Sequence, residues 1–249
     1  MISKAKVKYL KSLQLKKYRK EAQNFVVEGG KSVGELLKSD FEISLLYGTK
    51  QFLHDNESVV NTIKAEVLVV QEADLASVGT YQTNNAALAV AKMKPNHMSE
   101  PGKGEYVLLL DDIRDPGNVG TIIRAADWYG IKKIIASEET ADFYNPKVIS
   151  ASMGSFCRMN VFYTSLTDYL RENSKEVYGA FLDGTDVHAT VFAPDGGYIV
   201  MGNEANGISA EVEKQVHHRI TIPRYGAAES LNAGVATAII LDNLRRSQK

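Results

Sequence analysis

The chain has 249 residues, 44% of them hydrophobic and 24% charged, and a formal net charge of −1, as in a globular protein of one large or two modest domains. No apolar run approaches the roughly 20 residues that cross a bilayer, and no apolar segment follows the first lysines. We therefore expect neither a membrane span nor a secretory signal. The only cysteine, Cys157, excludes an internal disulfide bond and favours a reducing, cytoplasmic setting.

Charge is unevenly distributed along the sequence. A local basic segment on a chain that is otherwise slightly acidic indicates an anionic partner, with nucleic acid the first candidate. The alternative is a solvated helix face that binds nothing. The first twenty residues contain no acid and eight basic residues, namely Lys4, Lys6, Lys8, Lys11, Lys16, Lys17, Arg19 and Lys20.

The first 93 residues alternate strand and helix patterns, which predicts an α/β domain. Its first element is a helix over residues 3–20, with Val7 and Leu10 on the inner side. Further helical segments are expected at residues 31–38, 51–56, 57–64 and 72–77, and strands at residues 25–28, 42–47, 66–70 and 87–93.

Residues 94–105 show no apolar periodicity and contain two prolines and two glycines, so we interpret them as a linker between domains 1–93 and 106–249. Residues 106–110 are apolar throughout, which indicates a strand of a parallel sheet buried on both faces. The other strands expected in the second domain cover residues 132–136, 158–163, 177–182, 198–201 and 219–222, with helices at 116–129, 145–151, 166–173 and 209–216.

The end of the chain predicts a helix that is buried on every side. Pro223 ends the last strand, because proline cannot donate to a sheet ladder. Ser230 occupies the expected N-cap of a helix over residues 231–244, which is apolar on nearly every face. The polar residues at the mouth of this helix either cap it or form a site, and they are Glu229, Ser230 and Asn232.

Two earlier loops also follow predicted strands, and ligands of open parallel sheets bind at the carboxyl ends of strands. In the first, Asn118 lies in the opening turn of a helix, and Arg124 follows among apolar residues, where an arginine requires an anionic partner. That partner is a ligand or, in an internal ion pair, Asp127 or Glu204. The second loop, residues 202–207, has two glycines that let backbone wrap a ligand, and a plain turn is its alternative.

Several familiar signatures are missing from the sequence. The glycine fingerprint of dinucleotide-binding domains, the phosphate-binding P-loop and the nucleophile elbow of hydrolases do not occur. A nucleotide-binding oxidoreductase is therefore improbable. The five histidines show no metal-ligand spacing, so we expect no metal site.

The three polar loops resemble, in order and spacing, the motifs of the SpoU (TrmH-like) family of SPOUT RNA 2′-O-ribose methyltransferases. The resemblance covers about residues 106–246 and rests on residues 115–126, 199–209 and 222–239. The first domain looks like the smaller substrate-binding domain that often precedes this catalytic domain, through its strand at residues 25–29.

The resemblance implies an α/β fold in which a smaller RNA-binding domain precedes a C-terminal SPOUT domain with a mainly parallel sheet. The last helix of that domain would be threaded through a loop into a deep trefoil knot. S-adenosylmethionine would bind in the knot, and two chains would form a homodimer through their knots. The cofactor-binding residues implied by motif position are Leu182, Gly184, Gly202, Ile222 and Leu231.

The activity implied is methyl transfer from S-adenosylmethionine to a ribose 2′-hydroxyl of ribosomal or transfer RNA. A guanidinium keeps its proton above about pH 12, so we expect Arg124 to bind a phosphate and stabilise the developing oxyanion rather than act as a simple base. Glu204 would orient Arg124 or Asn118. The catalytic residues implied are Asn118, Arg124, Glu204, Ser230 and Asn232.

One departure from the family pattern concerns the cofactor pocket. Arg224 stands where the third motif usually has methionine, so a charged side chain either enters the expected pocket or points outward. The alternative function is a non-catalytic RNA- or ribosome-binding protein on a methyltransferase scaffold.

Overall fold

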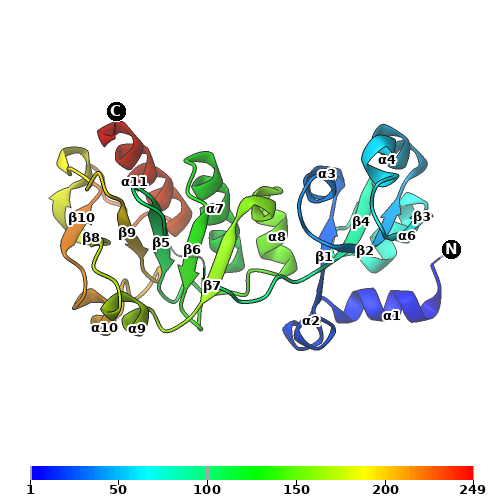
Figure 1. Ribbon diagram of the computed structural model, residues 1–249, viewed down its shortest axis with the longest axis horizontal. Helices are drawn as coiled ribbons and strands as arrows, with labels where there is room; N and C mark the ends of the chain where they lie inside the picture. The colour runs from blue at the N-terminus through cyan, green and yellow to red at the C-terminus, as the bar shows by residue number, and fades with distance from the viewer. Residues whose placement is uncertain (1, 99–100, 249) are drawn as a thin grey trace. The chain divides into compact units, whose positions relative to one another are not determined.

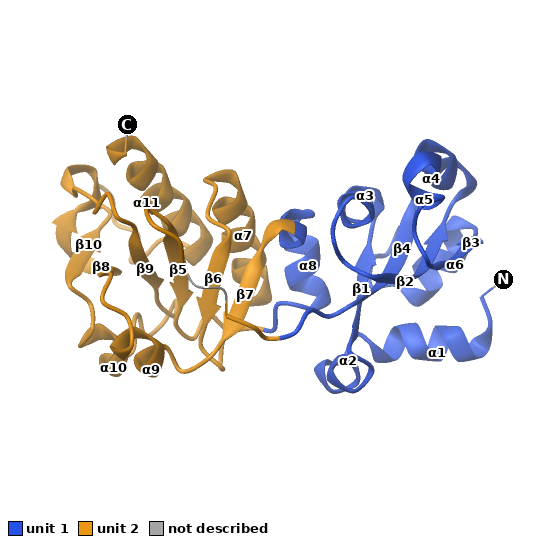
Figure 2. Cartoon of the chain, viewed as in Figure 1, with its two compact units in different colours: residues 1–95, 142–157 blue, residues 96–141, 158–249 orange. Residues whose placement is uncertain are grey.

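The computed structural model describes residues 2–98 and 101–248, which form two compact units (Figure 2). Unit 1 holds the described residues up to 95 together with residues 142–157. Unit 2 holds the described residues of 96–141 and 158–248. The division differs from the expected one because residues 142–157, expected in the second domain, belong to unit 1. Residues 99 and 100 of the expected linker lie outside the described residues.

Unit 1 is built on a four-stranded mixed sheet, as the alternating pattern predicts. The strand order is β1 (Asn24–Glu28), β4 (Ala87–Lys92), β2 (Ile43–Gly48) and β3 (Glu66–Val69), and β4 pairs antiparallel with both of its neighbours. The apolar core of this unit brings Leu10, Tyr47 and Leu75 together. The remaining helices are α3 (Gly30–Leu37), α4 (Lys50–Asp55), α5 (Glu57–Val60) and α6 (Glu72–Val78).

The basic N-terminal segment forms two helices, α1 (Lys4–Ser12) and α2 (Lys16–Ala22), so the expected single helix over residues 3–20 is wrong. The chain turns after α1, and the buried guanidinium of Arg19 donates to the carbonyl oxygens of Leu13 (2.9 Å) and Gln14 (2.8 Å). A continuous helix would use these carbonyls for its own ladder. Arg19 is therefore a structural residue and not part of a solvated basic face.

Residues 142–157 join unit 1 through aromatic packing and a buried ion pair. The helix α8 (Pro146–Ser152) lies against β1, and the ring of Phe25 packs 4.7 Å from that of Tyr144 and 6.0 Å from that of Phe156. Arg19 pairs with Asp142 at 2.6 Å. The short helix η1 (Ser155–Arg158) ends the segment.

Unit 2 is built on a six-stranded sheet in which every pairing is parallel, which confirms the mainly parallel sheet. The chain runs from β5 to β6 and β7 on one side, then crosses to the other side of β5, so the strand order reverses between β5 and β9. Ligands of open α/β sheets bind at such a reversal. The spatial order is β10 (His218–Thr221), β8 (Glu176–Asp186), β9 (Gly197–Met201), β5 (Tyr106–Leu110), β6 (Lys133–Ala136) and β7 (Asn160–Tyr163).

Helices cover this sheet in two groups. The short helices α9 (Leu166–Arg171) and α10 (Ala210–Glu213) share a core cluster with β5 and β9. The long helices α7 (Pro116–Trp128) and α11 (Ala233–Ser247) lie side by side (Figure 1). Their approach is close, because a Cβ on Gly234 would lie 2.6 Å from Cγ2 of Thr121. The remaining element is η2 (Val187–Ala189).

Two expectations about the last helix are wrong. Its N-cap is Asn232 and not Ser230, and within this chain its burial is confined to one stripe, on which Gly234, Thr237 and Leu241 lie. Val235 on another side is 47% exposed. The fold of a single chain therefore leaves part of the apolar surface of this helix exposed. In the described ranges, no helix has the length and apolar character that crossing a membrane requires.

Candidate active site

The first element of the site is the start of α7, just beyond the carboxyl end of β5. The carboxylate of Asp115 caps the helix by accepting from the backbone N–H of Asn118 at 2.8 Å, and Pro116 occupies the first turn, as predicted. This cap fixes the backbone of Asn118 at the strand end. Its side chain is therefore held where the neighbouring strand-end loops can reach it.

The second element is the loop after β9. Gly202 has no room for a side chain, since a Cβ there would lie 2.3 Å from the carbonyl carbon of Gly207. Asn203 and Gly207 exchange two backbone hydrogen bonds of 2.9 Å, and Nδ2 of Asn203 donates to the carbonyl oxygen of Asp112 at 2.7 Å. The loop is thus closed on itself and fastened to the loop that follows β5. This rigidity fixes the position of Glu204.

The three strand-end loops meet in one chain of side-chain hydrogen bonds. Nδ2 of Asn118 donates to Oε1 of Glu204 at 2.5 Å, and Nδ2 of Asn232 donates to Oδ1 of Asn118 at 2.7 Å. Asn118 serves as donor and acceptor at once, so its amide orientation is fixed. These hydrogen bonds join Asn118 to Glu204, 86 positions away in the sequence, and to Asn232, 114 positions away, at one end of the sheet.

Asn232 has a second role at the same place. Its Oδ1 accepts from the backbone N–H groups of Gly234 (2.9 Å) and Val235 (3.3 Å), which caps α11. Its Nδ2 is left for Asn118. Asn232 therefore caps α11 and also belongs to the hydrogen-bonded chain of the three loops.

Arg124 has none of the internal partners considered from the sequence. It is exposed on α7 and forms no hydrogen bond or ion pair with any residue of the described part of the chain. Asp127 pairs with Arg158 at 2.7 Å, and Glu204 is held by Asn118. Although its sequence neighbours are apolar, Arg124 lies on the exposed side of the helix. Its guanidinium is available to an anion from solvent.

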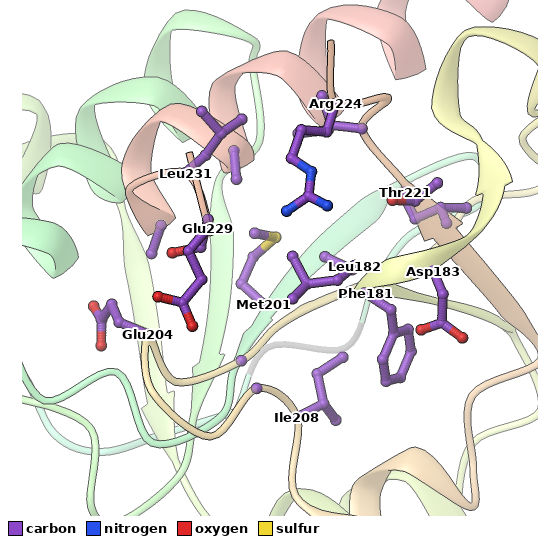
Figure 3. A pocket seen from close by; sticks show the side chains of 18 of the residues that line it. Phe181, Leu182, Asp183, Met201, Glu204, Ile208, Thr221, Arg224, Glu229 and Leu231 are labelled. Atoms are coloured by element: carbon purple, nitrogen blue, oxygen red, sulfur yellow. The ribbon is translucent and has the colours of Figure 1, made fainter. Parts of the chain in front are cut away.

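A cavity of about 590 Å³ lies beside this chain of hydrogen bonds (Figure 3). It is lined by the middle of β8, by the end of β9, by the loop 202–208, and by the end of β10, the segment after it and the start of α11. Among the expected site residues, Ser230 and Glu204 line it. Four of the five expected cofactor-binding residues do so too, namely Leu182, Gly202, Ile222 and Leu231.

Gly184 is the expected cofactor-binding residue that does not line the cavity. Its Cα faces β10, where a Cβ would lie 2.6 Å from the carbonyl oxygen of Arg219. The glycine therefore permits the close approach of β8 and β10 at their register shift. Its role in this structure is in strand packing.

One wall of the cavity is fixed by Arg219. Its guanidinium lies 3.7 Å from the centroid of the Phe181 ring and pairs with Asp183 at 2.8 Å. It also pairs with Glu213. The hydrogen bond to Asp183 is the main cause that raises the pKa of Arg219 above its ordinary value. One cation thereby pairs with two acids of the wall, and the three groups together keep one negative charge.

Comparisons with known proteins place this geometry in a family. The SpoU rRNA Methylase family matches residues 105–242, and an MRM3-like substrate binding domain matches residues 4–89. The chain belongs to the SpoU rRNA methylase family. It is therefore an RNA methyltransferase that uses S-adenosylmethionine, and the resemblance read from the three motifs is confirmed.

Relatives of known name or structure cover nearly the whole chain of this SpoU family member. A 23S rRNA (guanosine(2553)-2′-O)-methyltransferase of Bacillus subtilis, RlmP, is 30% identical over 96% of each chain. A TrmH-family RNA methyltransferase structure from Porphyromonas gingivalis is 37% identical over 99% of both chains, with a TM-score of 0.85. An AdoMet-bound rRNA methyltransferase from Sinorhizobium meliloti is 28% identical over 99% of this chain and 96% of its own, with a TM-score of 0.88.

Some residues that hold the site together could not be singled out from the motifs. Asn203 fastens the second loop to the first, and Asp111 accepts from the backbone N–H of Ser209 at 2.7 Å. The signal available for both was their position, within two residues of the end of a buried strand. Arg224, noted as a departure from the family pattern, is also part of the site, since it lines the cavity.

Proposed function

We propose that this SpoU family member transfers a methyl group from S-adenosylmethionine to a ribose 2′-hydroxyl of ribosomal RNA. The observation that carries the proposal is the hydrogen-bonded chain of Asn232, Asn118 and Glu204 at the edge of a ligand-sized cavity. RlmP of Bacillus subtilis, a relative that spans both units, is named as a 2′-O-methyltransferase of 23S rRNA, which favours ribosomal over transfer RNA.

The cavity suits S-adenosylmethionine in size and in charge. A volume of about 590 Å³ lies within the range of small-ligand pockets. Met201, Ile222 and Leu231 supply apolar surface, and the acids in the lining favour a cationic ligand. When bound there, S-adenosylmethionine supplies an electrophilic methyl group on a positively charged sulfur. Residues 222–231 and Gly202 would hold it, and Gly202 keeps the backbone of its loop free of a side chain.

The polar residues of the site would bind the RNA and stabilise the charge that develops during methyl transfer. The ribose hydroxyl loses a proton as its oxygen attacks, so charge must be stabilised on that oxygen. Arg124 is exposed and unpaired within the described residues, and it would bind the adjacent RNA phosphate while its N–H groups stabilise the oxyanion. Because the guanidinium is already protonated, the proton would pass to the phosphate itself or to an Arg124 that has transiently lost its own proton. Ser230 and Asn232 would position the ribose, and Glu204 fixes Asn118.

Residues 1–93 would bind the RNA, and residues 106–249 would carry out the transfer. The basic face of α1 and α2 supports this division. Apart from Lys6, which pairs with Glu66, and the buried Arg19, its cations are exposed to solvent and available to phosphates. The one further ion pair of these cations within the described chain, Lys17 with Glu21, is long (3.9 Å) and exposed. Tyr9 and Tyr18 on the same helices are exposed and offer surfaces on which bases stack. The exposed cations are Lys4, Lys8, Lys11, Lys16, Lys17 and Lys20.

We further propose a cytoplasmic homodimer formed through a knotted catalytic unit. Trp128 on α7 is 83% exposed and Val235 on α11 is 47% exposed, so these adjacent helices carry apolar surface that a second chain would cover. In this proposal α11 is threaded through a preceding loop, which forms the knot that the family resemblance implies. Size-exclusion chromatography with light scattering tests the dimer independently of activity.

The test of the function uses purified full-length protein, labelled S-adenosylmethionine and protein-free ribosomal RNA from a strain that lacks the gene. Label should enter the RNA with the wild-type chain and not with Asn118→Ala. A chain that binds the RNA without transferring label would instead be the non-catalytic binding protein considered as the alternative.

A further inference from the structure

We propose that Arg224 and Glu229 bind the amino-acid end of S-adenosylmethionine, Arg224 its carboxylate and Glu229 its ammonium group. The inference rests on the proposed function and adds two specificity residues to it. Both residues line the cavity, and the guanidinium of Arg224 points into it, toward Met201 and Leu182 (Figure 3). Among the described residues that line the cavity, Arg224 is the only lysine or arginine.

The two groups are available to a ligand. Within the described chain, the Arg224 guanidinium forms one hydrogen bond. This bond is long, since Nη1 lies 3.4 Å from the carbonyl oxygen of Ala228. Glu229 forms no hydrogen bond or ion pair with a described residue. The other acids of the lining are engaged, since Asp183 and Glu213 pair with Arg219 and Glu204 accepts from Asn118.

One free cation and one free anion in a single cavity match a zwitterion. The amino-acid end of the cofactor carries one carboxylate and one ammonium group, and its sulfur adds a second positive charge. The acids of the lining repel the carboxylate, so its favourable place is beside Arg224. The planar guanidinium binds a carboxylate through two parallel hydrogen bonds, which methionine at the same position cannot do.

Calorimetry with three ligands tests each pairing. S-adenosylhomocysteine has both groups, S-adenosyl-3-thiopropylamine lacks only the carboxylate, and methylthioadenosine lacks both. Arg224→Met should weaken S-adenosylhomocysteine about tenfold, as expected for one charge-assisted pair, and leave the other two ligands unchanged. Glu229→Gln should weaken the first two ligands about tenfold and leave methylthioadenosine unchanged.

Arg171→Met is the matched control, because Arg171 is an exposed arginine on α9 outside the cavity lining, and it should bind all three ligands as the wild type does. Arg224→Gln, checked by thermal unfolding, guards against a folding defect of the methionine variant. Equal loss of all three ligands, or no loss of any, in both Arg224 variants would overturn the inference. Failure of the wild type to bind S-adenosylhomocysteine would instead contradict the proposed function.

Discussion

Two arginines show how differently the two units use charge. Arg19 in unit 1 is 1% exposed, pairs with Asp142 at 2.6 Å and takes up two backbone carbonyls. Arg224 in unit 2 lies in a cavity with one long hydrogen bond to the described chain. Unit 1 therefore uses a buried cation to join two segments, and unit 2 leaves cations open at the strand ends. The difference separates a structural arginine from one that is available to a ligand.

The largest effect is expected at the buried pair. Arg19→Met leaves Asp142 as an unpaired, nearly buried charge and should lower the free energy of unfolding of unit 1 by about 3–5 kcal/mol. Urea unfolding followed by circular dichroism measures this change. The double variant Arg19→Met/Asp142→Leu should recover most of the loss, since both charges are gone. A cost below about 1 kcal/mol for the single change would place the pair among exposed ones.

The next effect concerns an arginine that is available to a ligand. Arg124→Ala should lower kcat/KM for methyl transfer by about 10²–10³-fold, because a donor to the developing oxyanion is lost. The melting temperature should stay unchanged, as Arg124 is exposed and forms no hydrogen bond or ion pair with the described chain. Arg171→Ala serves as the control for the loss of an exposed arginine. Full activity of the Arg124 variant would remove this residue from the chemistry.

The side chain of Asn232 both caps α11 and donates to Asn118, and one substitution separates these two roles. Asn232→Asp keeps the oxygen that caps α11 but loses the donor to Asn118. The free energy of unfolding should therefore change by less than about 0.5 kcal/mol. Methyl transfer should fall about tenfold or more, because the amide of Asn118 is released. Retained activity would mean that Asn232 serves only as a cap.

The last effect appears only at high pH and concerns unit 1. Burial raises the pKa of Tyr144 to about 12, against an ordinary value of 10.0. Between these values the unfolded chain loses the phenol proton while the folded chain keeps it, so stability falls as pH rises. Tyr144→Phe should reduce that fall by up to about 1.4 kcal/mol per pH unit above pH 10. Identical slopes for the two proteins would show that Tyr144 is not buried in solution.

The parallel sheet and most elements of unit 2 could be predicted because their signals are local. Continuous apolar strands such as Tyr106–Leu110, the Asp115 cap and the proline after it each act within a few residues. The end of a helix is a weaker signal when several polar residues compete. Ser230 and Asn232 are both good caps, and the choice between them depends on Asn118, 114 positions away.

The assignment of residues 142–157 to unit 1 could not be predicted for a similar reason. The sequence predicts a helix at residues 145–151 but not which sheet that helix covers. That choice depends on Asp142 meeting Arg19 and on Phe25 meeting Tyr144, contacts more than 100 positions apart. The candidate site residues come from three loops that share one family pattern, and the hydrogen bonds among Asn118, Glu204 and Asn232 show how those loops meet.

The most direct test of the account is the chemical nature of the methylated atom. Ribosomal RNA labelled by the wild-type chain and S-adenosylmethionine would be hydrolysed with alkali, which cannot cleave after a nucleotide whose 2′-oxygen is methylated. The account predicts that the label is recovered in an alkali-resistant dinucleotide from one position. Label recovered in a mononucleotide, as methylation of a base would give, would contradict it.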